Sequence, residues 1–135
     1  MQLTKFTDYA LRVLLYLGEH PNELGSISQI ATVHDISRNH LMKIVRHLGH
    51  IGVIDTIRGR SGGIRLSRPP SEINLGAVVR QCEETLELVD CSNCLLGPSC
   101  GLTHTLANAM GAFFEVLDRT TLADLLSKPS ARVRV

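Results

Sequence analysis

Three cysteines within ten residues have the type and spacing needed to bind a metal. They are Cys91, Cys94 and Cys100, at C-x2-C-x5-C spacing. Gly97 and Pro98 prevent a regular helix between them, so the loop can turn several sulfurs toward one point. The first residues do not resemble a signal peptide, so we expect a reducing cytoplasm, where clustered cysteines are more often metal ligands or redox groups than disulfides.

The spacing is compatible with three kinds of site. Iron-sulfur clusters take thiolates at short, irregular spacing. A structural zinc ion needs four ligands, and His104, four residues after Cys100, is an available fourth. The third alternative is a reducible thiol pair without a metal. Cys82 lies in an expected helix, where a free cysteine is usually a small buried core residue. Spacing alone favours a metal and leaves iron and zinc open.

Charge is distributed unevenly along a chain whose net charge is only +1. Residues 26–68 carry seven Lys and Arg against two acidic residues, whereas residues 69–135 carry five against eight. A basic segment joined to an acidic one is the pattern expected of a nucleic-acid reader with a separate control region. The low aromatic content of 4%, without Trp, argues against stacking on single-stranded bases. No apolar run approaches the roughly 18 residues that span a bilayer, so we expect no membrane partner.

The elements before the cysteines begin with an amphipathic helix. Its apolar positions recur at helical spacing from Phe6 onward, and the helix should end near Pro21. Thr7 is predicted to cap it, and Asp8 falls in its first turn, where the helix dipole favours an acidic side chain.

A helix-turn-helix is predicted next, between residues 28 and 48. Ser28 should cap its first helix, Asp35 form the turn and Ser37 cap the second helix. The side chains expected inside are Ile30, Ala31, Val33, Leu41, Ile44, Val45 and Leu48. Those left outside on the second helix are Arg38, Asn39, His40, Lys43, Arg46 and His47. These donors suit base edges and phosphates, as in a recognition helix, and a plain solvated face is the alternative.

Two short strands, 53–57 and 63–66, are predicted to form a hairpin with a basic, glycine-rich tip. Arginine suits a narrow minor groove and glycine allows close approach to a backbone. A hairpin of this kind after a helix-turn-helix makes a winged helix. The predicted DNA contacts are Ser28, Ser37, Arg38, Asn39, His40, Lys43, Arg46, Arg58, Arg60 and Arg65. Pro69 and Pro70 end this DNA-binding domain, which we place at residues 1–68.

Residues 69–135 are predicted to form the control region. A helix over 74–84 with Leu75, Val78, Val79 and Cys82 inside precedes the cysteine loop. A long helix from Gly101 to about Thr120 follows, and its apolar face is wide for so small a chain. We expect it to pair with a second copy, the alternative being a core helix within one chain. A short helix over 121–126 and a tail over 129–135 complete the chain. The fold class is therefore mainly α with a small β-hairpin wing: a winged helix-turn-helix plus a long dimerisation helix.

Together these motifs resemble the iron-sulfur winged-helix transcription repressors, over nearly the whole chain. The resemblance is carried by residues 3–12, by Ser37 to His40, by the wing from Arg58 to Leu66 and by the cysteine loop. The opening and the Ser-Arg-Asn-His tetrapeptide are most similar to the nitric-oxide-sensing branch.

The resemblance implies a homodimeric repressor that binds a near-palindromic operator in double-stranded DNA. It also implies an iron-sulfur cluster held by Cys91, Cys94 and Cys100, usually 4Fe-4S in this branch, with 2Fe-2S as the other possibility. The fourth ligand it implies is Asp8 of the partner subunit, and nitric oxide would release the DNA. A sister regulator that senses iron, cluster supply or redox state is the alternative, and a zinc-stabilised repressor is a remote one.

One departure from the family pattern concerns the cysteine loop. Only Ser92 and Asn93 separate the first two cysteines, which is fewer residues than the family usually has. The departure bears on the path of the loop and on the fourth ligand, for which His104 resembles the histidine of another branch.

No strand-helix-strand pattern accompanies the Cys-x-x-Cys pair, so we do not expect an enzyme.

Overall fold

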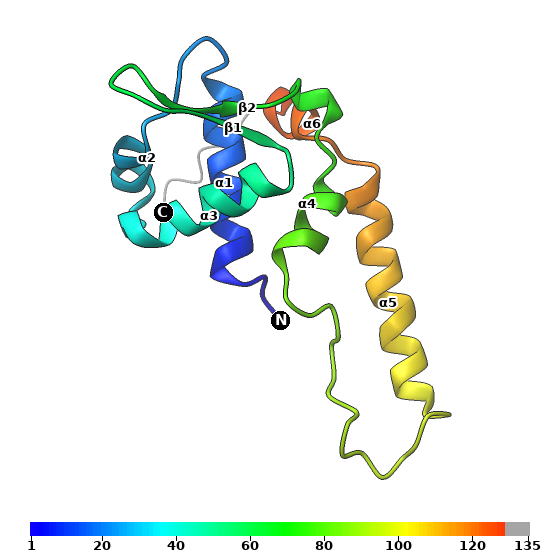
Figure 1. Cartoon of the computed structure of the whole chain (residues 1–135). Helices are drawn as coiled ribbons and strands as arrows, with labels where there is room; N and C mark the ends of the chain where they lie inside the picture. The colour runs from blue at the N-terminus through cyan, green and yellow to red at the C-terminus, as the bar shows by residue number, and fades with distance from the viewer. Residues whose placement is uncertain (129–135) are drawn as a thin grey trace.

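The structure, a computed structural model, describes residues 1–128 as helices with one two-stranded hairpin (Figure 1). The elements in chain order are α1 Lys5–Glu19, α2 Ile27–His34, α3 Arg38–His50, β1 Ile54–Ile57, β2 Gly63–Leu66, the 3-10 helix η1 Pro70–Glu72, α4 Leu75–Cys82, α5 Gly101–Asp118 and α6 Leu122–Ser127. This order confirms the predicted fold class. The tail predicted over 129–135 lies outside the described residues.

The N-cap of helix α1 lies three residues earlier in the chain than predicted. Thr4 is the N-cap, and its side chain accepts a hydrogen bond from the backbone N–H of Thr7 at 3.3 Å. Thr7 lies inside the helix and is fully buried, so the prediction that Thr7 caps α1 is wrong. Asp8 is in the first turn, as predicted.

The helix-turn-helix forms from α2 and α3, with one cap displaced. Ser26 caps α2 by accepting from Gln29 N, so Ser28 lies within the helix and is not its cap. Val33 is 60% exposed and does not face inward as predicted. Asp35 adopts the left-handed conformation with φ of 51° that ends α2, which confirms the predicted turn.

The helix α3 has the predicted cap and the predicted inner face. The Ser37 side chain accepts from His40 N at 3.2 Å. The buried residues of the helix are Leu41, Ile44, Val45 and Leu48. Each fully buried aliphatic side chain contributes about 1.5–3 kcal/mol to folding, so this face fixes α3 against the core and leaves the opposite face to solvent.

The wing is an antiparallel hairpin in which Ile54 pairs with Leu66 and Ile57 with Gly63. Its tip needs glycine at two points. Gly59 has a φ of 107°, and a Cβ on Gly62 would lie 2.1 Å from the Ile57 carbonyl oxygen. The glycines therefore allow the tight return of the chain that displays the arginines of the tip.

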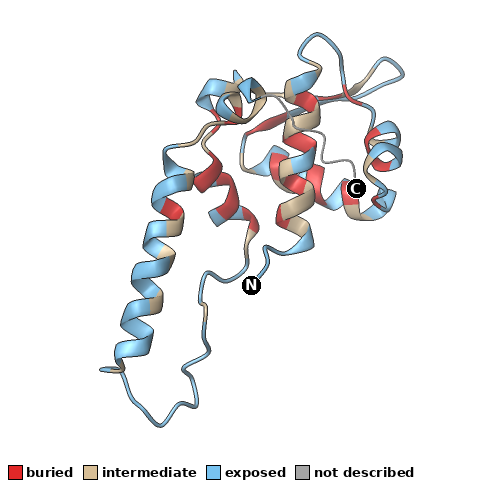
Figure 2. Ribbon diagram, turned by 180° about the vertical axis from the view of Figure 1, so that it is seen from behind, coloured by how far each residue is buried: buried red, intermediate tan, exposed pale blue. Residues whose placement is uncertain are grey.

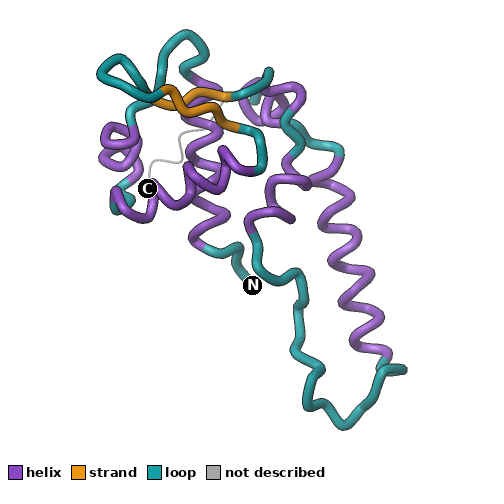
Figure 3. Tube along the Cα trace, in the orientation of Figure 1, coloured by secondary structure: helices purple, strands orange, loops and turns teal. Residues whose placement is uncertain are grey.

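A single core lies under the winged helix, with α1 packed against α2, α3, α4, α6 and β2 (Figures 1 and 3). Leu14 of α1, Ile44 of α3 and Ile64 of β2 are fully buried in it. Leu122 of α6 and Val78 of α4 belong to the same cluster, so the second half of the chain returns to cover the first. Among the described residues, no helix is both long and apolar enough to cross a membrane.

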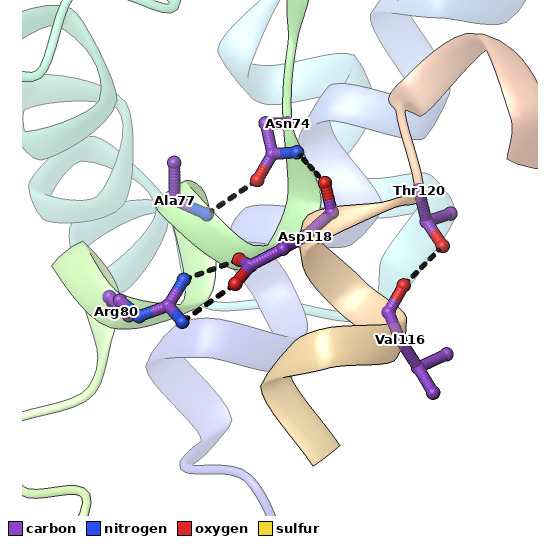
Figure 4. Close-up of polar contacts among 6 residues, drawn as sticks. All are labelled: Asn74, Ala77, Arg80, Val116, Asp118 and Thr120. Carbon is purple, nitrogen blue, oxygen red and sulfur yellow. Dashed lines mark hydrogen bonds and ion pairs between the residues drawn. The ribbon is translucent and has the colours of Figure 1, made fainter. Parts of the chain in front are cut away.

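The helix α5 projects from this body and is held at its C-terminal end by α4 (Figure 4). Arg80 donates two hydrogen bonds to the carboxylate of Asp118, one of them at 2.9 Å, and its guanidinium lies 4.0 Å from the centre of the Phe114 ring. Asn74 caps α4 and donates to the Asp118 carbonyl oxygen at 2.7 Å. A Cβ on Gly76 would collide with the Asp118 carboxylate, so a larger residue there would require this side chain to move.

The Arg80–Asp118 pair predicts an acid-sensitive contribution to stability. The hydrogen bond from Arg80 lowers the pKa of Asp118, so the folded chain binds this proton less readily than the unfolded chain does. The stabilisation is therefore present at neutral pH and is lost as the pH falls below about 4. We expect Asp118→Asn to flatten the acid limb of the free energy of unfolding, measured by urea denaturation from about pH 6 to about pH 3. Because the pair is exposed, added salt should reduce the difference between the wild-type protein and Asp118→Asn. An acid limb that is the same in both proteins would contradict the prediction.

Candidate functional site

The three predicted ligand cysteines lie on a long loop that leaves α4, extends away from the body and returns to α5 (Figures 1 and 3). Cys91 and Cys94 are exposed and Cys100 is half-buried. Cys94 N donates to the Cys91 carbonyl oxygen at 3.2 Å and Cys100 N to that of Gly97 at 3.4 Å, so two tight turns shape the loop. Gly97 has a φ of 73°, a conformation that favours glycine.

Two of the three thiols each lie near Thr103 in the first turn of α5. Cys100 is the N-cap of the helix, and the nearby backbone N–H groups of Thr103 and Leu102 lower the pKa of its thiol. The sulfur of Cys91 is 3.5 Å from the Thr103 hydroxyl oxygen. A helix N-terminus favours negative charge, so this position promotes the thiolate that a metal needs.

The remaining predicted ligands are not gathered with them. Within residues 1–128, no three His, Cys, Asp or Glu side chains come together at one point. His104 is exposed on α5, one turn past Cys100. Asp8 lies on α1, where its carboxylate accepts from Arg12 at 2.8 and 3.0 Å. The chemistry of the donor set nevertheless fits an iron-sulfur cluster, since thiolates on irregular backbone are the ligands that such clusters take.

Cys82 has the opposite environment. It is buried in the core on α4, as predicted, and desolvation followed by the nearby Glu83 charge raises its pKa to about 11. A buried, protonated thiol is a poor nucleophile and a poor metal ligand.

This contrast predicts a pattern of alkylation. In metal-free folded protein at a pH of about 7.5, iodoacetamide should modify Cys91, Cys94 and Cys100 within minutes. Cys82 should react roughly a hundredfold more slowly, since the thiolate is the reacting form. Mass spectrometry of peptides taken over a time course measures the alkylation rate of each cysteine. Alkylation in denaturant is the control, in which all four cysteines should react at equal rates. Early modification of Cys82 in the folded chain would contradict its placement.

Nine of the ten predicted DNA-contacting side chains are exposed, and six of these nine are basic. The exposed members on α2, on α3 and its cap, and on the wing are Ser28, Ser37, Arg38, Asn39, Lys43, Arg46, Arg58, Arg60 and Arg65. Arg65 has only a loose ion pair with Asp55, at 3.9 Å, and the tip of the wing extends into solvent. This is an arrangement that can place α3 in a major groove and the wing beside it.

Two histidines of α3 that were expected on its outer face have partners within the chain. The His40 ring packs edge-on against Tyr9 of α1, with 5.4 Å between ring centres, and leaves the residue half-buried. The Nε2 of His47 lies 2.7 Å from the carbonyl oxygen of Gln81 on α4. The prediction that His47 faces outward is therefore wrong, because apolar and polar partners from α1 and α4 occupy that side of α3.

Three contacts near the site were missed from the sequence. Glu83 accepts from both Thr4 N and Thr4 Oγ1, at 2.8 and 3.0 Å, across 79 residues of chain. The His47–Gln81 contact also joins distant segments, and no local pattern reveals either. The Asp8–Arg12 pair could have been found, since acid and base four residues apart on a helix commonly interact.

Comparison with known proteins identifies relatives along nearly the whole chain. The Rrf2 family, described as an iron-dependent transcriptional regulator, matches residues 3–128. The HTH-type transcriptional regulator NsrR of Geobacillus kaustophilus is 54% identical over 132 residues, which cover 93% of this chain and 90% of the relative. The regulator of the same name from Bacillus subtilis is 49% identical, with coverage of 93% and 90%.

Solved structures agree with these relatives. The global cysteine regulator CymR of B. subtilis superimposes with a TM-score of 0.78 at 29% identity, covering 94% of this chain and 97% of CymR. IscR of T. potens has a TM-score of 0.77 at 24% identity, over 93% of this chain and 86% of IscR, and supports the fold alone. The predicted resemblance is thus confirmed. With a winged helix, exposed basic side chains on α3 and the wing, and relatives that are transcriptional regulators, this chain belongs to the Rrf2 family of DNA-binding transcriptional regulators.

Proposed function

We propose that this protein is a cytoplasmic, homodimeric repressor that senses nitric oxide through an iron-sulfur cluster and then releases its operator. The observation that carries the proposal is the position of the three-thiol loop, which connects α4 to the exposed helix α5 beside a winged helix. The name of the relatives that are about half identical over most of the chain supports the effector.

Residues 1–68 are proposed to bind DNA. The N-terminal part of α3, with Arg38, Asn39 and Lys43, would read base edges in the major groove, and Arg46 would contact phosphate. The wing arginines Arg58 and Arg60 would reach the adjacent minor groove. Residues 69–135 are proposed to form the control region. This boundary separates two functions and not two folded units, because α4 and α6 share the core of the first part.

The helix α5 offers the surface for a second copy. Leu102, Ala109 and Val116 recur at seven-residue intervals and are all exposed, with Leu102 at 58% and Val116 at 66%. Among the described residues of α5, only Phe114 is buried. Figure 2 shows that most of the helix is exposed. Apolar positions at heptad spacing favour helix pairing, and a dimer would present two recognition helices to a near-palindromic site.

Cys91, Cys94 and Cys100 are proposed to hold the cluster, of the 4Fe-4S type, with 2Fe-2S as the alternative. When bound, the cluster supplies the group that reacts with nitric oxide. Cys100 contributes a thiolate promoted by the N-terminus of α5, and Cys91 lies beside the same turn. Asp8 of the partner subunit is the proposed fourth ligand and His104 the second choice. The two hydrogen bonds from Arg12 orient the Asp8 carboxylate within its own chain.

The test begins with anaerobic purification, an absorption spectrum and analysis of iron and sulfide. Operator binding by holo protein, nitric-oxide-treated protein and apo protein is then measured by fluorescence anisotropy at one stated salt concentration, because the affinity depends on salt. We expect tight binding only by the holo form. A colourless protein with one zinc would contradict the cluster, equal binding by all forms would contradict the switch, and release by oxidant but not by nitric oxide would indicate the sister regulator.

A further inference from the structure

Three helices meet at one point beside the start of the cysteine loop. We call this point the α1–α3–α4 junction and define it by Thr4, Phe6, His47, Gln81 and Glu83. It joins the beginning of α1, the last turn of the recognition helix α3 and the last turn of α4. The cysteine loop begins immediately after Glu83, which is the C-cap of α4.

The His47 side chain touches both other helices of the junction. Its ring stands edge-on to Phe6 of α1, with 5.4 Å between centres and an interplanar angle of 77°. Its Nε2 is 2.7 Å from the Gln81 carbonyl oxygen, and since a carbonyl only accepts, the histidine donates this bond. The acceptor lies in the last turn of α4, where carbonyl groups have no partner within the helix.

Glu83 closes the junction from the other side. Its carboxylate accepts from the backbone N–H and the hydroxyl of Thr4, the N-cap of α1. Burial alone would raise the pKa of Glu83, but hydrogen bonds from Thr7 and Thr4 together lower it, so the carboxylate is ionised at neutral pH. The contacts thus run in a ring from Thr4 to Glu83, along the backbone to Gln81, across to His47 and back through Phe6 to α1.

We propose that His47 is a positioning residue that couples the cysteine loop to the recognition helix, through its hydrogen bond to the Gln81 carbonyl group at the end of α4. A displacement of the start of the loop shifts the last turn of α4, and the bond transmits this shift to α3. Glu83 transmits the same shift to the first turn of α1. The inference rests on the proposed function, because it concerns how a change in the loop alters DNA binding.

The experiment compares two variants that each keep one half of the His47 contact. His47→Gln can place its amide nitrogen near the position of Nε2 and donate to Gln81, but it loses the ring. His47→Phe keeps the ring against Phe6 but has no donor. Operator affinity of the holo and apo forms of each full-length protein is measured at one salt concentration, and the ratio of the two affinities is the coupling.

We expect His47→Phe to reduce the wild-type ratio by roughly fivefold or more, the scale of one hydrogen bond in a coupled pair of sites, whereas His47→Gln keeps it within about twofold. In the apo proteins, His47→Phe should also speed hydrogen exchange of amides around residues 79–85, a readout independent of any cluster. Rescue by glutamine separates coupling from mere packing, since packing depends on the ring.

Three outcomes overturn the inference in distinguishable ways. If a folded His47→Phe variant has the same ratio of holo to apo affinity as the wild-type protein, the inference is overturned and the proposed function is intact. A loss of coupling in His47→Gln equal to that in His47→Phe assigns the effect to ring packing and also overturns it. If the holo and apo forms of the wild-type protein bind the operator equally, the proposed function and the inference are overturned together. If His47→Phe does not fold, His47→Leu takes its place, since it lacks both the ring and the donor whereas His47→Gln lacks only the ring. Equal ratios in His47→Leu and His47→Gln overturn the inference.

Discussion

Replacing Arg38 with alanine is expected to weaken operator binding by about 1–3 kcal/mol per half-site, and a homodimer has two half-sites. Arg38 is the first residue of α3, next to the Ser37 cap, and it is exposed. The first residues of a recognition helix reach deepest into the major groove, where Arg contacts guanine with two hydrogen bonds. The variant should therefore lose affinity and also tolerate base changes that the wild-type protein rejects.

The matched substitution in the wing should behave differently. Arg60 lies at the exposed tip of the hairpin and is proposed to contact the backbone and the minor groove. Arg60→Ala should weaken binding to all sequences alike and reduce the slope of log affinity against log salt by about one per contact. The outcome shows which arginine reads sequence and which supplies charge.

Anisotropy titrations against the operator, a half-site mutant and unrelated DNA, each at several salt concentrations, measure both effects. Arg119→Ala is the control, because Arg119 is an exposed arginine at the end of α5, outside the basic surface of α3 and the wing. A uniform loss of affinity in Arg38→Ala without relaxed specificity would place Arg38 on phosphate instead of a base.

Introducing a charge on the exposed stripe of α5 is expected to have an equally large effect. Ala109 lies at the middle of the stripe, between Leu102 and Val116, and is exposed in the single chain. Ala109→Arg would bury an unpaired charge between two copies at a cost of several kcal/mol. We expect monomers at micromolar concentration and operator affinity lower by about 10²–10⁴, because two linked half-site contacts become one.

Sedimentation velocity measures the oligomeric state, and anisotropy measures the operator affinity. Asn108→Arg is the control, since Asn108 is exposed on the same helix and is rotated by about 100° from Ala109. Circular dichroism should show both variants folded, because neither residue is buried. A dimeric Ala109→Arg variant that binds the operator normally would contradict pairing through this stripe.

Local chemistry determined much of the fold. The spacing of Leu41, Ile44, Val45 and Leu48 placed α3 and its inner face correctly, because a helix repeats every 3.6 residues. The predictions that Ser37 caps α3 and that Asp35 forms the turn were also correct, because caps and turns depend on residues within four positions of each other. The two wrong caps, Thr7 and Ser28, are in segments that also have a suitable Thr or Ser a turn or less upstream, so the signal was ambiguous.

The candidate site divides in the same way. The cysteine loop and the basic face of α3 were visible as residue types at fixed spacing, and the family resemblance was visible as motifs. The sequence did not show that Cys91 and Cys100 both lie against the first turn of α5 through Thr103, while Cys94 extends into solvent. The path of an irregular loop depends on few local preferences, so spacing alone does not fix it.

The sequence by itself determined the elements, the basic surface and the thiol donors, because each arises from neighbours along the chain. Only the tertiary structure decided which partners the donors of α3 have. His47 looked like another outward, DNA-facing residue, yet it donates to Gln81, 34 residues away, while Glu83 holds Thr4 across 79 residues. Contacts between residues so far apart form only when the core brings α1, α3 and α4 together, and no periodicity in the chain records them.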